Sequence, residues 1–207
     1  SLYGVQLAGT ITSGGGPVSV VGTGGANSGG SGIGVGLNVS GARITSGGNA
    51  PITVTGTGRG NGAASYGIQL ISGTLITATG GTVALDANSV VTGAAGLAHQ
   101  GAITNVGSGS VSISSDRILM SAGTINATSV LLQPRTAGLE IALGSFDTDT
   151  SLGLADSELD LITTATLGIG NNLTGPIRVS GVVSPANAGV LEITTADTLT
   201  SAPNTNI

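Results

Sequence analysis

The chain has 207 residues, a formal net charge of −5 and an unusual composition, with 38 Gly, no Cys, no Trp and only 7% charged residues. Its five cationic residues are all Arg, too few for the basic stripe that nucleic-acid binding requires. The lack of Cys excludes disulfides and zinc–thiolate sites. A mean hydropathy of +0.43 provides apolar material for a core, and the scarcity of helix-forming residues favours β structure. No run of about 18 apolar residues occurs, so we predict no membrane insertion.

One sequence pattern is written three times between residue 3 and about residue 87. Its copies begin at Tyr3, Ile33 and Tyr66, so the period is 30 and then 33 residues. They read YGVQLAGTITSGGGPVSVVGTGG, IGVGLNVSGARITSGGNAPITVTGTG and YGIQLISGTLITATGGTVALDA. A fixed period in this range is typical of a solenoid, a propeller or an array. Because the pattern is already under way at Tyr3, we expect the chain to be a segment of something longer.

Apolar residues alternate with small polar residues inside each copy, which indicates strands with one buried face. Beyond about residue 93 the spacing shortens to 27 and then 22 residues, although two of the three apolar columns continue. We expect the loss to fall in corner loops such as residues 22–32 and 56–65, since loops tolerate length changes better than strands. The predicted core residues are Val5, Leu7, Ile11, Val18, Val20, Val35, Leu37, Ile44, Ile52, Val54, Ile68, Leu70, Ile76, Val83, Leu85, Ile103, Val111, Ile113, Ile125, Val130 and Leu132.

The middle strand of each copy carries a polar residue next to its buried Ile. These residues are predicted to form an outward ladder of Thr12, Thr45, Thr77, Thr104 and Asn126. Stacked Thr pairs stabilise sheets by roughly 0.2–1 kcal/mol each. Paired Thr columns are also what an ice-binding surface needs. Here the neighbouring column contains Arg43 and Leu75, which break a flat array and disfavour that function.

These patterns predict an all-β fold, a single right-handed parallel β-helix of roughly seven to nine coils over residues 1–207. The handedness is expected from strand twist and crossover rules. Long coils of about 30–33 residues are expected in residues 1–96 and shorter coils in residues 97–145. Residues 146–207 are expected to hold an acidic loop with a short helix, and then further coils.

The segment 147–160 contains half of the acidic residues of the chain. Residues 155–161 are predicted to form one helical turn with a carboxylate near its N-terminus. Asp147, Asp149 and Asp156 are weak calcium candidates, but the segment has neither the EF-hand order of ligands nor the nonapeptide of calcium-binding β-rolls. A solvated loop is favoured, and no metal or cofactor is predicted. His99, the single histidine, is predicted to lie in a loop or at a coil edge.

The repeat YG[VI]xL…ITSGG…[PI]xTVTGTGG resembles repeats of very large secreted bacterial proteins of the filamentous-haemagglutinin type. The stretches DRILMSAGTINATSVLLQPRTAG and LGLADSELDLITTATLGIGNNLTGPIRVSG are similar to segments that follow such repeats. This resemblance covers most of the chain. It implies a right-handed parallel β-helix, a location outside the bacterial cell or on its outer surface, and a role in adhesion, aggregation or matrix formation.

The first functional hypothesis is therefore a non-catalytic rod that mediates adhesion, aggregation or head-to-tail assembly. Its expected partners are copies of itself, further repeats, or glycans and other groups on host or bacterial surfaces. The alternative is a β-helix that binds or cleaves carbohydrate. Glycoside hydrolysis requires two facing carboxylates, yet no column of the repeat contains a second acid. Only Tyr3, Tyr66 and Phe146 could stack on a sugar, and the equivalent positions of Tyr3 and Tyr66 favour packing at a corner.

Overall fold

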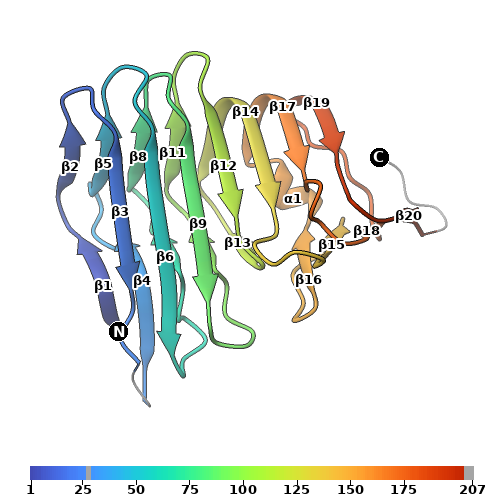
Figure 1. The fold of residues 1–207 in the computed structure, drawn as a ribbon, viewed down its shortest axis with the longest axis horizontal. Helices are drawn as coiled ribbons and strands as arrows, with labels where there is room; N and C mark the ends of the chain where they lie inside the picture. Colours follow the sequence, from blue (N-terminus) through green and yellow to red (C-terminus); the bar gives the residue numbers. More distant parts are fainter. Residues whose placement is uncertain (27–28, 203–207) are drawn as a thin grey trace.

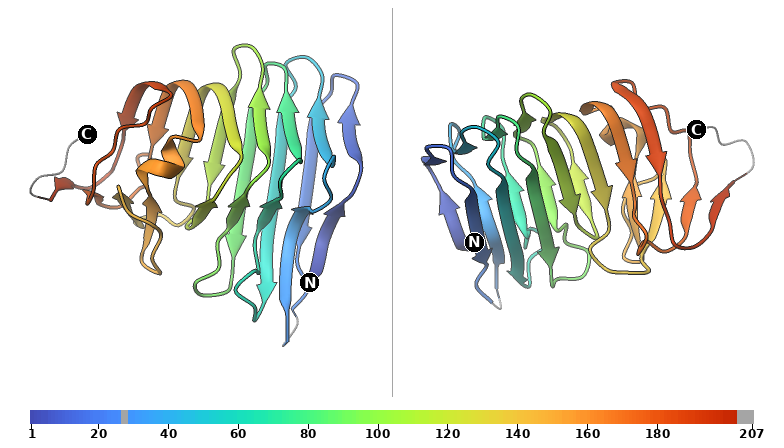
Figure 2. Two further views of the ribbon diagram at one scale, coloured as in Figure 1. Left: turned by 180° about the vertical axis from the view of Figure 1, so that it is seen from behind. Right: turned by 45° about the horizontal axis from the view of Figure 1, so that its top comes forward.

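The computed structural model describes residues 1–26 and 29–202, and these residues form an all-β fold of mostly parallel strands with one short helix, α1 (Asp156–Leu159). Successive repeats lie side by side, so that the chain advances along its longest axis from β1–β3 at one end to β19 and β20 at the other (Figure 1). The views in Figure 2 keep this order. The predicted all-β, parallel architecture is confirmed at this level.

Each repeat contributes strands to separate parallel ladders. Ladder A contains β1 (Leu2–Leu7), β4 (Ser31–Leu37), β7 (Ile68–Leu70), β10 (Leu97–His99) and β13 (Ile118–Met120). Ladder B1 contains β2 (Thr10–Ser13), β5 (Arg43–Ser46), β8 (Leu75–Ala78), β11 (Ala102–Asn105) and the first halves of β14 (Thr124–Gln133) and β17 (Ile162–Ile169). The strands of one ladder come from successive repeats, as expected for in-register stacking.

Ladder B2 is the longest continuous feature of the described residues. It contains β3 (Val18–Thr23), β6 (Ile52–Gly60), β9 (Val83–Ser89), β12 (Ser110–Ser114), the second halves of β14 and β17, and β19 (Ala188–Ile193). Ladder C contains β16 (Ser151–Leu154), β15 (Glu140–Leu143), β18 (Ile177–Val179) and β20 (Leu199–Ser201), in that spatial order. An antiparallel contact joins the start of β4 to the end of β6.

Aliphatic side chains of successive repeats lie above one another and form one continuous core. In ladder B2, Val18 pairs with Ile52, which pairs with Val83 in the next repeat. The structure buries every residue of the expected core except Val5, Leu7 and Ile11, which are half-buried. These three belong to the first repeat, which has a neighbouring repeat on one side only.

Strands extend into both of the expected corner loops at residues 22–32 and 56–65. β3 continues to Thr23, β6 continues to Gly60, and β4 already begins at Ser31. The reason is close approach of two backbones: a Cβ atom on Gly56 would overlap the carbonyl group of Gly67. Glycine here lets ladder B2 meet ladder A without side chains between them, rather than providing a turn.

The chain departs from repeat order in the acidic segment. β16 follows β15 in the sequence, yet it pairs with β15 on one side and contacts β13 on the other. The strand therefore turns back and fills the position between β13 and β15 (Figure 1). The predicted helical turn forms here as α1, but the predicted loop also contains this additional strand.

Candidate functional site

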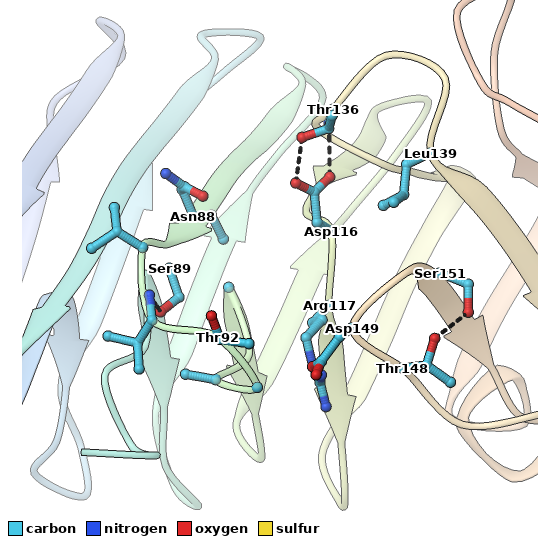
Figure 3. Close-up of a pocket in the computed structure, with 16 residues that line it drawn as sticks. Asn88, Ser89, Thr92, Asp116, Arg117, Thr136, Leu139, Thr148, Asp149 and Ser151 are labelled. Carbon is cyan, nitrogen blue, oxygen red and sulfur yellow. Dashed lines mark hydrogen bonds and ion pairs between the residues drawn. The ribbon is translucent and has the colours of Figure 1, made fainter. Parts of the chain in front are cut away.

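A cleft of about 330 Å³ lies where the corners of successive repeats meet the acidic segment (Figure 3). It is lined by the end of β9 and the corner that follows it (residues 87–94), by Asp116 and Arg117 between β12 and β13, by Thr136 and Leu139 after β14, and by Thr148, Asp149 and Ser151 near the start of β16. Several segments distant in the sequence therefore build this cleft.

The charged groups of the cleft already have protein partners. The Arg117 Nη1 atom donates to Asp149 Oδ1 at 2.7 Å. Asp116 accepts the backbone N–H groups of Arg135 and Thr136 at 2.8 and 2.7 Å, and the Thr136 hydroxyl at 2.6 Å. The cleft thus presents a neutralised ion pair and hydroxyl groups. Because 61% of the Asp149 side chain is exposed, solvent screens this ion pair, and the pair contributes little to stability.

Two carboxylates bridge the gap between β13 and β16, and we call Asp147 and Glu158 the carboxylate bridge. Asp147 accepts the Ile118 N–H of β13 at 2.9 Å through Oδ2 and the Gly153 N–H of β16 at 2.8 Å through Oδ1. Glu158 accepts the Met120 N–H and the Ala155 N–H, both at 3.1 Å, through its two oxygens. The edge amides of β13 therefore bind side-chain oxygens in place of a neighbouring strand.

Burial perturbs both members of the carboxylate bridge. It raises the pKa of Asp147 to about 7, while the Gly153 N–H and the Arg117 charge oppose the shift and the Glu158 charge adds to it. Burial also raises the pKa of Glu158, opposed by the N–H groups of Met120 and Ala155. Removing a carboxylate from water disfavours its charged form, and donated hydrogen bonds compensate only in part. The carboxylate bridge is consequently a structural contact whose two carboxyl groups have raised pKa values.

His99 lies inside the core, so its predicted placement in a loop or at a coil edge is wrong. It is the last residue of β10, is fully buried, and stacks between Leu70 and Met120. Within the described residues, neither ring nitrogen has a hydrogen-bond partner of normal geometry. Burial lowers the pKa of His99 to about 4, and the nearby Thr124 backbone opposes the shift in part. The buried column of ladder A therefore contains a neutral imidazole at the position that Leu70 occupies in the preceding repeat.

Aromatic residues from distant parts of the sequence gather on the outside of ladder A. Tyr66 and Phe146 line one hollow of about 200 Å³ together with Leu119. Phe146 is 69% exposed. Tyr3 lies apart from this hollow, with its ring against Gly36. Two aromatic residues that are 80 positions apart in the chain are thus brought to one surface.

The three calcium candidates are held by different partners. Asp147 belongs to the carboxylate bridge, Asp149 pairs with Arg117, and Asp156 accepts the backbone N–H of Ser184. Across the part of the chain that the structure describes, no group of three or more His, Asp or Glu residues could hold a metal ion.

The expected outward ladder lies in register along ladder B1. Thr12, Thr45, Thr77, Thr104 and Asn126 are consecutive Cα partners. The hydroxyl oxygens of Thr12 and Thr45 are 3.4 Å apart. In the neighbouring column Arg43 and Leu75 pair directly with each other, as the sequence pattern indicates.

Sequence reasoning missed the cleft, the carboxylate bridge and the aromatic hollow. Each depends on the return of β16 toward β13, which no repeat of the pattern signals. The available clue was the clustering of acids at residues 147–160 between apolar residues such as Leu152 and Leu159, both of which are buried. Carboxylates interleaved with buried residues are constrained to find partners near the core.

Comparison with protein-family models, with curated proteins and with solved structures finds no match to this chain. Among the described residues, no helix is long and apolar enough to cross a membrane.

Proposed function

We propose that the chain is a right-handed parallel β-helix that serves as a non-catalytic rod in a secreted bacterial surface protein or extracellular filament. The supporting observation is ladder B2, in which seven parallel strands from successive repeats stack over buried aliphatic columns within the described residues. Right-handed connection of parallel strands is the strong rule for such crossovers. Stacked repeats give stability that accumulates along one axis, which suits a spacer or a filament.

The surface chemistry supports a role in contact rather than in catalysis. Only 7% of the residues are charged, and the two acids that line the cleft, Asp116 and Asp149, are held by backbone amides and by Arg117. The outward face of ladder B1 carries Thr and Asn in register. A long neutral surface rich in hydroxyl groups fits broad, weak and repeated contacts with a cell surface. The location outside the cell follows from the resemblance to filamentous-haemagglutinin-type repeats.

An adhesion assay tests this function. Beads coated with the chain are expected to adhere to bacterial or epithelial cells, and to one another, more than beads coated with an inert protein. Beads carrying the core variant Ile44→Asp are expected to lose this adhesion, whereas the outward variant Thr45→Asp keeps most of it. Equal adhesion of the two variants and of the inert control would refute the proposal.

Carbohydrate binding is the second candidate, and the hollow between Tyr66 and Phe146 favours it. An apolar surface flanked by polar groups such as Arg117 is suited to the face of a sugar ring. Glycan-array binding that disappears in Phe146→Ala but not in Leu173→Ala would favour this candidate, because Leu173 is also an exposed apolar residue but does not line this hollow. Release of reducing sugar by the unaltered chain would overturn the non-catalytic role.

A further inference from the structure

We infer that three adjoining hollows in the irregular half of the rod form one groove that binds a linear, uncharged oligosaccharide. This inference rests on carbohydrate binding, the second candidate function, and extends it from one sugar ring to a chain of sugars. The groove consists of the aromatic hollow of Tyr66 and Phe146, the cleft, and a third hollow of about 480 Å³, which we call the polar hollow. The side chains that line the polar hollow include Asp86, Ser114, Gln133, Arg135, Asn171 and Leu173.

The three hollows adjoin one another through shared lining residues. Thr136 lines both the polar hollow and the cleft. Gly93 and Arg117 line both the cleft and the aromatic hollow. The groove therefore runs from the outward face of ladder B2, past the corner between β9 and β10, to the outside of ladder A. Its parts measure about 480, 330 and 200 Å³, and a single pocket of about 300–1,000 Å³ already holds a small ligand, so the groove has room for an extended one.

Consecutive strands place polar side chains in one outward column of the polar hollow. Asp86 of β9 pairs with Ser114 of β12, which pairs with Gln133 of β14. The Gln133 Nε2 atom donates to Ser114 Oγ, and Asn171 Nδ2 donates to Gln133 Oε1, both at 2.7 Å. Asn171 Oδ1 in turn accepts the Leu173 N–H at 2.7 Å. This chain of hydrogen bonds sets which end of each carboxamide donates and which accepts.

The same network leaves hydrogen-bonding groups for a ligand. A carboxamide nitrogen carries two hydrogens, and within the described residues Gln133 and Asn171 each use one. Arg135 donates through Nε to Asp86 Oδ1 at 2.7 Å, which leaves its Nη groups and Asp86 Oδ2 to bind other molecules. A hydroxyl group both donates and accepts, so adjacent hydroxyls of a sugar can bind these donors and this acceptor together. Because the network orients the groups before binding, little conformational freedom is lost on binding.

The cleft and the aromatic hollow continue this surface toward ladder A. In the cleft, Thr92 lies on one side and Thr148 and Ser151 lie on the other (Figure 3). In the aromatic hollow, Tyr66 and Phe146 provide rings that can pack against the apolar face of a sugar. The groove thus combines hydroxyl and carboxamide groups along its length with aromatic rings at one end, a combination that matches the alternating polar and apolar surfaces of a saccharide.

Charge and strand pairing disfavour other extended ligands. The acidic and basic residues that line the groove are five acids and two Arg, a formal net −3, so the groove repels polyanions such as sulfated glycans. A peptide that adds a strand to a sheet needs a free strand edge. The strands beneath the polar hollow, β9, β12 and β14, are each paired on both sides. An uncharged saccharide avoids the repulsion and needs no strand edge.

An array of linear neutral oligosaccharides tests the groove in the full chain. The probes are glucose, galactose, mannose and N-acetylhexosamine series from single sugars to hexasaccharides, each beside its sulfated or sialylated counterpart. For at least one neutral series, affinity is expected to rise at least about tenfold from the single sugar to the hexasaccharide, because a longer ligand contacts more of the groove. The charged counterparts are expected to bind more weakly.

Substitutions at the two ends separate the groove from the aromatic hollow alone. Phe146→Ala is expected to weaken binding of every length at least about tenfold. Leu173→Ala and Gln133→Ala are expected to weaken hexasaccharide binding about fivefold and to leave single sugars unchanged, because a single sugar on the aromatic rings does not reach the polar hollow. Ser112→Ala is the matched control, since Ser112 also faces outward on β12 but lines none of the three hollows. Phe146 and Leu173 are exposed, so their removal leaves the core intact, and circular dichroism checks the fold of each variant.

Three results would overturn the inference. The first is that no neutral oligosaccharide binds, and the second is that the sulfated or sialylated counterparts bind equally well or more tightly. The third is that Leu173→Ala and Gln133→Ala bind hexasaccharides as the unaltered chain does; sugar binding that still depends on Phe146 would then belong to the aromatic hollow alone. If no glycan binds and coated beads still adhere to cells, the groove fails while the proposed rod stands.

Discussion

Removing the carboxylate of Glu158 tests whether the carboxylate bridge holds β13 to β16. In the structure this buried side chain accepts one backbone N–H from Met120 and one from Ala155. Glu158→Ala leaves both amides without an acceptor. Glu158→Gln keeps one carbonyl oxygen but places an NH₂ group against the second amide, so that one donor is lost.

The expected size follows from those two amides. Each unsatisfied buried donor costs about 1–3 kcal/mol. The substitution also removes the penalty of burying a carboxylate, and this gain offsets part of the cost of the two amides. Glu158→Ala is therefore expected to lower the free energy of unfolding by about 2–4 kcal/mol, and Glu158→Gln by about half as much. For a chain of this size, 1 kcal/mol shifts Tm by about 2–4 °C, which predicts a fall of roughly 10 °C for Glu158→Ala.

Thermal unfolding followed by circular dichroism at pH 7 measures this shift. Ser157→Ala is the matched control, because Ser157 is exposed on the same helix and is expected to change Tm by no more than about 2 °C. If Glu158→Ala has the same Tm as Ser157→Ala, the two amides are satisfied in another way, and Glu158 has no structural role in the bridge. A lower Tm for Glu158→Gln than for Glu158→Ala would also contradict the expectation, because Gln should leave fewer amides without an acceptor.

Three further substitutions test the core, the glycine contact and the buried imidazole. Ile44→Asp buries an unpaired charge and is expected to lower the free energy of unfolding by about 3–5 kcal/mol, whereas Thr45→Asp should lower it by under about 1 kcal/mol. Equal urea midpoints of the two variants would mean that the strand register is wrong. Gly56→Ala is expected to lower the free energy of unfolding by about 1–3 kcal/mol, because its Cβ would overlap the Gly67 carbonyl group. Gly14→Ala is the control and should change it very little, because a Cβ on Gly14 meets no atom. Equal melting temperatures of the two variants would contradict the close approach of the backbones at Gly56 and Gly67. As pH falls from 6.5, the ordinary pKa of histidine, toward 4, the unfolded chain protonates His99 before the folded chain does, so this one group lowers the free energy of unfolding by about 3 kcal/mol across that window. His99→Leu is expected to remove this loss, and an unchanged difference between urea midpoints at pH 7 and pH 4.5 would show that another group causes it.

The regular part of the fold could be predicted because two signals agree there. Val35 and Leu37 alternate with glycine, and they recur one period later as Ile68 and Leu70. A one-residue slip would expose every one of these side chains, so the register follows from the pattern alone. The structure pairs Val35 with Ile68 and Leu37 with Leu70.

The candidate site could not be predicted, because it forms where the repeat is broken. Arg117 and Asp149 lie 32 residues apart and meet only because β16 returns to β13. The glycine-rich stretch around Gly56 was equally misleading, since composition favours a turn. What decides its conformation is the backbone of another repeat, and a single stretch of sequence contains no information about that neighbour.

The scarcity of charge has a physical cause in the stacking itself. An outward residue of a parallel, in-register ladder lies about 4.8 Å from its counterpart in the next repeat. Two like charges at that separation repel by roughly 1 kcal/mol even in water, and a recurring motif would multiply the cost along the column. Residues 1–85 avoid it with Thr, Ser and Gly, and Arg43 stands between uncharged partners, Thr10 and Leu75. Charges become frequent after residue 86, where the repeat is irregular and carboxylates can lie beside Arg or backbone amides. The same rule that keeps the first three repeats nearly free of charge thus leaves most of the acids, and with them most of the candidate site, to the irregular second half of the rod.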